Sequence, residues 1–370
     1  MQTISSLDLF FELVRMGIGT CEKLSSTPTP SQWKEIYEIS MKQAVAGIAF
    51  TGVEKLCAEQ APPKELLLNW FRQCQTIAAY NNKLNILACK ITDKFQSEGF
   101  NSVILKGQGI ARLYDHPNRR MAGDIDIWLD GNKNDIIKYV KLFVPDCRPV
   151  YHHVDFLNMG GVETEIHFTP TWMNSYFTNN TLQKYFEKEK NAQFGNKISL
   201  GDCDGYINVP TNSFNRIYIL LHIYRHLFQE GIGLRQILDY YYVLRQGFNE
   251  NEKNETLAIL KELKMLRFAG AVMYILKKIF NIEDKYMLTA PIEKDGEFLL
   301  TEVLEAGNFG KYSPRYKYNM SRSLFTRALS KSTHQMKFIF SYPSETIWGP
   351  LFRIWHYFHK KRLKSVGNEK

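Results

Sequence analysis

The chain has 370 residues, which is long enough for two or three compact units with a sizeable core. Its 47 lysines and arginines outnumber its 38 aspartates and glutamates, and the formal net charge of +9 favours anionic partners such as nucleotides, nucleic acid or an acidic membrane surface. The six cysteines include no Cys-x-x-Cys pair, so neither a zinc spacing nor a disulfide framework is visible, and reduced thiols are expected.

The first residues do not resemble a targeting segment. Asp8, Glu12 and Arg15 interrupt the apolar residues near the N-terminus, so no signal peptide is expected. No stretch approaches the roughly 18 uninterrupted apolar residues that cross a bilayer. We therefore expect a soluble, cytoplasmic protein without a transmembrane segment.

Apolar periodicity divides the chain into three predicted regions. Residues 1–96 have helical spacing, residues 97–209 mix strands with helices, and residues 210–370 return to helical spacing. The predicted fold class is α+β, with a mixed-sheet catalytic core between an N-terminal helical region and a C-terminal helical domain. The predicted strands are 103–105, 125–129, 150–157, 162–168 and 206–209. The predicted helices include 64–95, 110–114, 134–143, 215–229, 234–246 and 255–280.

A strand entering a tight turn is expected at residues 102–109. The β-branched run ends in Lys106, and Gly107 and Gly109 follow it, so backbone N–H groups can approach a phosphate there. The alternative for Lys106 alone is a solvated charge at a strand end.

Two aspartates lie two residues apart in the run Gly-Asp-Ile-Asp-Ile that begins at Gly123. In a strand, Asp124 and Asp126 point to one face while Ile125 and Ile127 pack against the core. Like charges on one face repel, and a divalent cation is the usual agent that offsets the repulsion. The alternative is a solvent-facing strand edge that carries charge for solubility.

Residues 162–168 alternate in the same way. Glu163, Glu165 and His167 share one face, which adds a third acid to the pair upstream. A single strand histidine is more often a hydrogen-bonded structural residue than a ligand.

In this order and spacing, these residues resemble a bacterial family of uncharacterised nucleotidyltransferases with the polymerase-β-like fold. The residues that carry the resemblance are Leu105-Lys106-Gly107, Tyr114, Pro117, Arg120, Gly123 to Asp126, Glu165 to His167, and Gly231 to Asp239. Gly107 is followed here by Gln108, where many members of the superfamily have Gly or Ser.

The resemblance implies transfer of an NMP group from a nucleoside triphosphate, such as ATP, to an acceptor. Asp124, Asp126 and Glu165 would be the catalytic residues and would hold Mg²⁺ or Mn²⁺, with Glu165 as third ligand or as base. The acceptor could be a small molecule, a sugar, a protein or an RNA end. The expected substrate-binding residues are Lys106, Gly107, Gln108, Arg120, His167 and Arg235.

Two helical pairs have alternative interpretations. His222 and His226 have metal-ligand spacing, but no acid follows at a zincin-like position, which favours packing or substrate contact over zinc. Arg235 and Asp239 could form an ion pair. The resemblance instead implies that this helix closes over the nucleotide.

Two further segments complete the sequence-based expectations. His152 and His153 lie on a predicted strand, where only one of them can face the site. Residues 348–364 interleave aromatic and basic side chains, so they form either an interfacial helix in weak contact with an anionic surface or a terminal helix. The favoured interpretation is a terminal helix that covers the helical domain with its apolar side.

Two other classes of function remain open. A nucleotide-binding or regulatory protein can keep the fold without turnover, although the intact acids Asp124, Asp126 and Glu165 argue against that. A basic C-terminal adaptor could instead bind a membrane or a nucleic acid.

Overall fold

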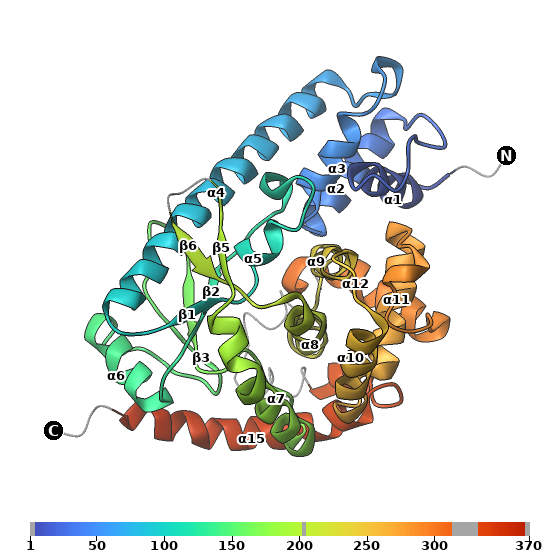
Figure 1. The fold of residues 1–370 in the computed structure, drawn as a ribbon. Coiled ribbons are helices and arrows are strands. Elements are labelled where there is room, and N and C mark those ends of the chain that lie inside the picture. The colour runs from blue at the N-terminus through green and yellow to red at the C-terminus, as the bar shows by residue number, and fades with distance from the viewer. Residues whose placement is uncertain (1–3, 202–204, 313–331, 367–370) are drawn as a thin grey trace.

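A computed structural model describes residues 4–201, 205–312 and 332–366. Helices surround a small mixed sheet, and the predicted α+β class is confirmed (Figure 1). The long helix α4 runs along one flank of the sheet, and the last helix, α15, crosses below the sheet and the helices that follow it (Figure 1).

The described part of the N-terminal region contains four α-helices. Their bounds are α1 Ser6–Gly17, α2 Pro30–Lys42, α3 Ala46–Val53 and α4 Lys64–Ser97. Helix α2 begins where the sequence supplies a capping box, since Thr29 accepts from the backbone of Gln32 and the Gln32 side chain accepts from Thr29. This reciprocal cap satisfies backbone groups that the first helical turn leaves unpaired.

The sheet has the strand order β1-β2-β4-β3. Strands β1 and β2 are antiparallel, β2 and β4 are parallel, and β3 and β4 are antiparallel. A separate hairpin pairs β5 with β6. The bounds are β1 Ser102–Ile104, β2 Ile125–Leu129, β3 His153–Asp155, β4 Thr164–His167, β5 Lys197–Ser199 and β6 Tyr206–Asn208.

Other α-helices of the described residues connect these strands and form the C-terminal region. Their bounds are α5 Gln108–Ala111, α6 Lys133–Phe143, α7 Tyr176–Phe194, α8 Asn212–Gln229, α9 Leu234–Arg245, α10 Glu250–Glu262, α11 Leu266–Phe280, α12 Glu293–Ala306 and α15 Pro343–Ser365. Short 3₁₀ turns lie at Pro117–Arg119 and Asn308–Gly310.

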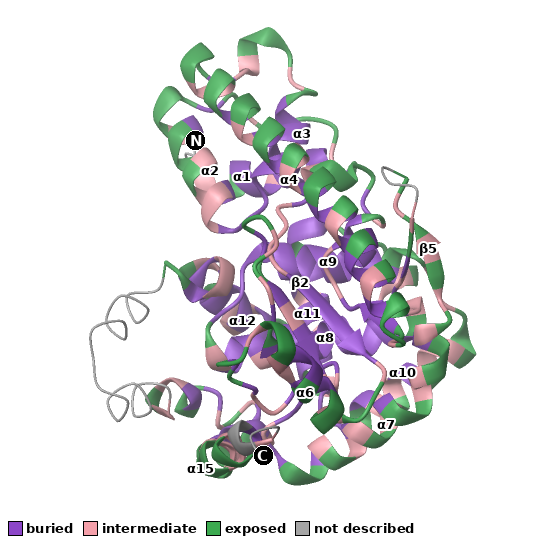
Figure 2. Ribbon diagram, turned by 90° about the vertical axis from the view of Figure 1, so that its left-hand side faces the viewer, coloured by how far each residue is buried: buried purple, intermediate pink, exposed green. Residues whose placement is uncertain are grey.

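The sheet separates two hydrophobic clusters. Alternation along β2 sends Ile125 and Ile127 into a cluster with residues of α4 and α6, while Trp128 joins the larger helical cluster on the opposite face. The larger cluster takes residues from α1 as well as α8, α9 and α11, so the N-terminal and C-terminal helices share one core. Strand β2 and helices α8, α9 and α11 form the buried centre of the molecule (Figure 2).

Several predicted elements have different bounds. The single helix expected over 255–280 is wrong, because Lys264 adopts a left-handed φ of 59° and separates α10 from α11. The strand expected over 150–157 is shortened to β3, because the backbone N–H of Val150 donates to the His153 carbonyl and the chain turns there. The helix expected over 110–114 begins earlier, at Gln108.

The cysteines depart from the expectation of reduced thiols at one position. Cys21, Cys57, Cys74 and Cys147 are free, but Cys89 on α4 is disulfide-bonded. Cys203 lies outside the described residues. Among the described helices, none combines the length and apolarity needed to cross a bilayer.

Candidate functional site

Three carboxylates converge on the face of the sheet opposite α4. Asp126 on β2 and Glu165 on β4 are register partners in neighbouring parallel strands, and Asp124 immediately precedes β2. One ligand atom from each of the three residues lies within 4.8 Å of the other two. Asp124 and Asp126 thus lie together, as alternation predicts, and the pairing of β2 with β4 brings Glu165 beside them.

The two aspartates have different electrostatic surroundings. Asp126 is buried, which by itself would raise its pKa, but Lys106 Nζ at 3.0 Å and His167 Nε2 at 3.0 Å hold that pKa far below its usual range. The pKa of Asp124 is raised, first by the charge of Asp126 and then by burial. A cation near Asp124 would relieve this repulsion.

The turn after β1 brings Lys106 and Gly107 to the acids. Burial lowers the pKa of Lys106, but Asp126 and Asp124 outweigh it, so the amine stays protonated. Gly107 has φ of +54°, and a Cβ there would lie 3.8 Å from the Asp124 carbonyl oxygen. The side chain of Gln108 is directed elsewhere, because its amide donates to Asn85 and Asn81 on α4.

Arg120 connects the loop before β2 to helix α9. Its Nε and Nη2 donate to the two carboxylate oxygens of Asp239 at 2.7 and 2.9 Å. The Tyr114 hydroxyl also donates to Asp239, at 2.6 Å. Arg120 thus lies beside the acids, but two nitrogens of its guanidinium form a buried ion pair with Asp239.

Arg235, near the start of α9, faces the aspartates. Its Nη1 donates to the Met121 carbonyl at 2.8 Å, and its guanidinium lies 5.3 Å from the ring centre of Phe309. The alternative of an ion pair between Arg235 and Asp239 is wrong, since Asp239 accepts from Arg120 and Tyr114. Arg235, Lys106, Gly107 and Asp124 instead line one small niche.

Histidines surround Glu165. His167 Nε2 lies 3.0 Å from Asp126 and 3.4 Å from Glu165, and these two carboxylates raise its pKa against the effect of burial. His153 Nδ1 also lies 3.4 Å from Glu165, so His153, Glu165 and His167 form a second group with metal-ligand spacing. The sequence did not single out His153 as a site residue.

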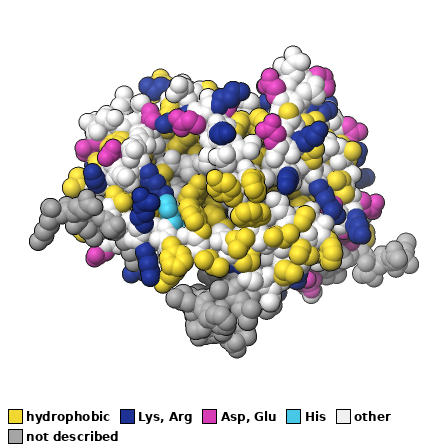
Figure 3. All heavy atoms as spheres, turned by 90° about the horizontal axis from the view of Figure 1, so that it is seen from below, with side chains coloured by type: hydrophobic (Ala, Val, Ile, Leu, Met, Phe, Trp, Pro, Cys, Tyr) yellow, Lys and Arg dark blue, Asp and Glu magenta, His cyan; other side chains and the backbone are white. Residues whose placement is uncertain are grey.

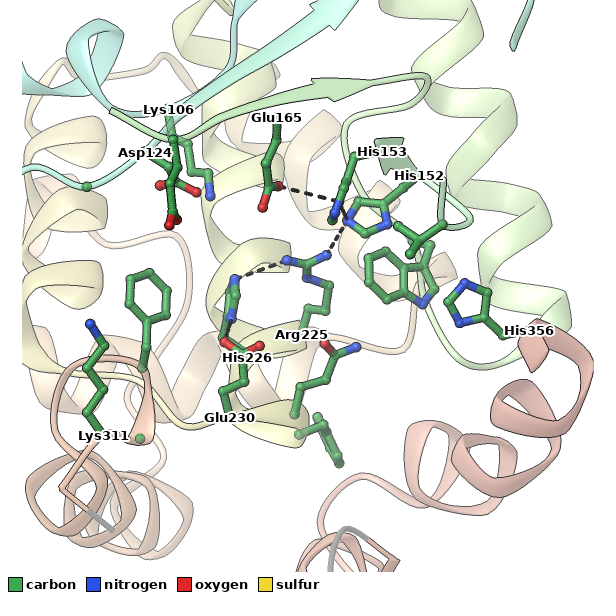
Figure 4. A pocket seen from close by; sticks show the side chains of 18 of the residues that line it. Lys106, Asp124, His152, His153, Glu165, Arg225, His226, Glu230, Lys311 and His356 are labelled. Atoms are coloured by element: carbon green, nitrogen blue, oxygen red, sulfur yellow. Dashed lines mark hydrogen bonds and ion pairs between the residues drawn. The ribbon is translucent and has the colours of Figure 1, made fainter. Parts of the chain in front are cut away.

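A cavity of about 960 Å³ opens beside the acids. Lys106, Asp124 and Glu165 line one end, and Arg225, His152 and His356 lie farther along it (Figure 4). Such a volume is typical of sites for small molecules and cofactors.

Arg225 is the main residue that sequence reasoning missed. It lies one residue before His226 on α8, and its guanidinium donates to His152 Nε2 at 2.8 Å and His226 Nε2 at 3.1 Å (Figure 4). It also lies 4.3 Å from the ring centre of Trp172. The spacing of His222, Arg225 and His226 on one helix face could have indicated it.

The two adjacent histidines both reach the cavity. The expectation that only one of them can face it is wrong, because His152 precedes β3 and does not follow the alternation of the strand.

His222 and His226 on α8 pack edge to face, with ring centres 4.3 Å apart, and His226 Nδ1 lies 3.2 Å from the Glu230 carboxylate. Burial lowers the pKa of His226 to about 4, which keeps its ring neutral at pH 7.

Comparison with known proteins gives a family and one solved structure. A sequence profile described as an uncharacterised nucleotidyltransferase family matches residues 29–281. The chain is also similar to an antigenic nucleotidyltransferase-like protein from Paracoccidioides brasiliensis, with 13% identity and a TM-score of 0.35, over 58% of this chain and 96% of that chain. No protein of curated function matches the chain.

Proposed function

Because the chain belongs to this family of uncharacterised nucleotidyltransferases, we propose that it transfers a nucleotidyl group from a nucleoside triphosphate to an acceptor nucleophile. The observation that carries the proposal is the convergence of Asp124, Asp126 and Glu165 at one end of a large cavity. Three carboxylates held within 4.8 Å of one another repel unless positive charge intervenes.

The donor set suits a magnesium or manganese ion. All three groups offer carboxylate oxygen, which these hard cations prefer, and the raised pKa of Asp124 reflects the repulsion that a cation would remove. When bound, the ion would neutralise charge on the phosphates and on the attacking group. Lys106 already neutralises part of the charge of Asp126.

In the proposed reaction, an acceptor oxygen forms a bond to the α-phosphorus, the bond to the bridging oxygen breaks, and pyrophosphate leaves. Glu165 would complete the ligand set or take the proton of the acceptor hydroxyl. Its contacts with His153 and His167 hold the carboxylate in place for either role.

The phosphates would lie next to Lys106, Gly107 and Arg235. Arg235 holds the Met121 carbonyl and thereby fixes the loop that leads into Asp124. Its Nε has no hydrogen-bond partner in the described structure, and its fork suits phosphate oxygens. Gln108 would support this turn through α4 instead of touching the nucleotide.

The position of the radiolabel tests the proposal. Purified protein, Mg²⁺ and a cell lysate would be incubated with each nucleoside triphosphate labelled at either the α- or the γ-phosphate. Nucleotidyl transfer moves only the α-label to an acceptor and releases pyrophosphate. Asp124→Asn should abolish that labelling, whereas transfer of the γ-label, or labelling unchanged in the variant, would contradict the proposal.

A further inference from the structure

Two arginines lie in the wall of the cavity beyond the acids. Among the residues that the structure describes, Arg225 donates to the neutral rings of His152 and His226, and burial keeps the pKa values of these histidines low. Arg353 on α15 donates to Gln335 at 2.8 Å and to Ser332 at 2.7 Å. Within the described parts of the chain, neither guanidinium has a carboxylate at ion-pair distance.

These arginines belong to one layered wall. Arg225 lies over Trp172, Trp172 stacks on Phe352 with ring centres 5.9 Å apart, and Arg353 follows Phe352 in the chain. Trp172, Arg225, Phe352 and Arg353 all line the cavity. A half-buried guanidinium that lacks a counter-ion is costly until an anion pairs with it.

We propose that Arg225 and Arg353 bind an oxyanion, a phosphate or a carboxylate, on the acceptor molecule. The identification of this ligand as the acceptor rests on the proposed function. The triphosphate of the donor would be neutralised at the other end, by the cation and by Lys106, which lies 3.0 Å from Asp126. The acceptor would place its anion on the arginine wall, and its nucleophile would point toward Glu165.

Binding in EDTA separates this proposal from the catalytic one. Calorimetry with phenyl phosphate, benzoate and neutral phenol should show binding of an anionic probe by the wild-type protein but not of phenol. Arg225→Gln and Arg353→Gln should each weaken the binding by about tenfold or more. Asp124→Asn should retain it, and the exposed α4 variant Arg72→Gln serves as the matched control.

The same variants distinguish the acceptor from the donor. Arg225→Gln should bind a magnesium complex of a non-hydrolysable nucleoside triphosphate as the wild type does. Loss of that binding would assign Arg225 to the triphosphate, and no anion binding by the wild type would also overturn the proposal. Failure of nucleotidyl transfer, by contrast, would leave the anion-binding result unchanged.

A second, independent observation concerns the outer face of α15. Ile347, Leu351, Ile354 and Phe358 follow one another at four-, three- and four-residue spacing and are 56%, 52%, 60% and 63% exposed. Hydrophobic side chains gather broadly on this face of the molecule, with lysines and arginines beside them (Figure 3). The favoured expectation that the apolar side of this segment covers the helical domain is therefore wrong.

The inner face of α15 is the one that packs on the protein. Its aromatic and histidine side chains contact Tyr151, whose backbone N–H donates to His356 Nε2 at 3.1 Å. The only acid of the helix, Glu345, is buried and accepts from the backbone of Asn174 and Ser175. The outer face therefore presents no carboxylate, and exposed Lys361 and Arg362 lie at its C-terminal end.

We infer that this outer face docks on an anionic phospholipid bilayer. It is the convex side of a helix and not a groove, and its combination of apolar stripe, aromatic residues and basic end matches helices that lie in the headgroup region. A second copy is a poorer occupant, because the chain carries a net charge of +9 and the same basic end would meet itself.

Sedimentation of the full chain with vesicles tests the second proposal. The protein should bind vesicles that contain phosphatidylglycerol, bind pure phosphatidylcholine much less, and lose binding as salt increases. Replacement of Leu351 and Phe358 together by Glu should abolish binding, while Leu68→Glu on α4, which also replaces an exposed leucine, should retain it.

Two outcomes would overturn the bilayer assignment. One is equal vesicle binding by the double variant or none by the wild type. The other is a wild-type dimer in light scattering that the double variant lacks, since this result would assign the face to a second copy of the chain.

Discussion

Asp124 and Asp126 look equivalent in the sequence but differ in what surrounds each carboxylate. The sequence pattern alone predicts that either can be replaced by Asn without loss of the fold. In the structure, Asp126 is the buried partner of both Lys106 and His167, whereas Asp124 has its pKa raised by the charge of Asp126. One aspartate therefore stabilises the metal-free site, and the other destabilises it.

This difference predicts that the two Asn variants differ in stability in EDTA. Asp126→Asn should lower the free energy of unfolding by about 3 kcal/mol, because it leaves the buried Lys106 without its counter-charge. Asp124→Asn should change it by less than about 1 kcal/mol, or raise it, because it removes a repulsion. Urea unfolding of both variants measures the difference. An equal decrease in the free energy of unfolding would show that the two carboxylates contribute equally to stability.

The lowered pKa of His226 predicts how stability depends on pH. Its folded-state pKa of about 4 lies below the unfolded value of about 6.5, so the unfolded chain binds the extra proton between these values. The contribution of the neutral, buried His226 ring to the free energy of unfolding is therefore complete above pH 6.5. It is lost as the pH falls toward 4, by up to about 1.4 kcal/mol per pH unit.

His226→Gln should reduce the slope of the free energy of unfolding against pH by the amount that corresponds to the uptake of about one proton on unfolding. Denaturation of both proteins at a series of pH values between 7 and 4.5 gives the two slopes. His152, His153 and His356 also have lowered pKa values and contribute equally to both curves, so only the difference counts. Parallel curves would contradict the low pKa of His226.

At the scale of elements, the sequence predicted what local alternation controls. The Asp-x-Asp strand was predicted over 125–129 and observed at Ile125–Leu129, and the Glu-x-His strand lies within its predicted range. Alternation also placed Asp126 beside Asp124 in the first of these strands, and Glu165 on the same face as His167 in the second. The register that makes them neighbours depends on the parallel pairing of β2 and β4, which no local pattern contains.

Other features were missed because they depend on packing between distant segments. The apolar spacing continues across Lys264, so it could not show the break between α10 and α11. Arg120 matched the family position, but its partner Asp239 lies 119 residues away. The inward face of α15 is set by Tyr151, and nothing in residues 348–364 alone indicates which side is covered.

The Arg120–Asp239 pair should hold α9 against the loop that precedes β2. Asp239→Ala would leave the buried Arg120 unpaired and should lower the free energy of unfolding by about 3 to 5 kcal/mol. Tyr114→Phe, which removes one hydrogen bond to Asp239, should cost about 1 kcal/mol.

The neighbouring pair of Asp115 and Arg245 is the matched control. Arg245 Nη1 and Asp115 Oδ2 lie 3.8 Å apart at the surface, so Asp115→Asn should change the free energy of unfolding by less than about 1 kcal/mol. Urea unfolding compares the three variants. A small effect of Asp239→Ala would mean that water or another group replaces the carboxylate.

At the scale of the whole molecule, the cavity is formed by segments far apart in the chain. Residues of the sheet supply the acids, α8 supplies Arg225, and α15 returns to the core and supplies Arg353 and His356. The N-terminal and C-terminal helices share one hydrophobic cluster, so they form a common support behind the site. The proposed acceptor wall therefore depends on how firmly α15 is docked.

Tyr151 makes several of the contacts that dock α15. Its ring contacts Phe352, Trp355 and His359, with ring centres 6.1, 5.4 and 6.0 Å away. Aromatic pairs of this kind contribute about 0.5 to 1.5 kcal/mol each beyond the area that they bury. Tyr151→Ala should therefore weaken the docking of α15 by at least about 2 kcal/mol.

Hydrogen exchange followed by mass spectrometry measures this change directly. In Tyr151→Ala, amides of Pro343–Ser365 should exchange about 30-fold faster, since each 1.4 kcal/mol corresponds to a factor of ten. Amides of β2 and α8 should keep their protection, because their clusters do not depend on this ring. Tyr357→Ala, which removes an exposed tyrosine from the same helix, should leave exchange unchanged. If both variants exchange alike, Tyr151 is not what holds α15 over the cavity, and the helix must be retained by Glu345 and its backbone partners at Asn174 and Ser175.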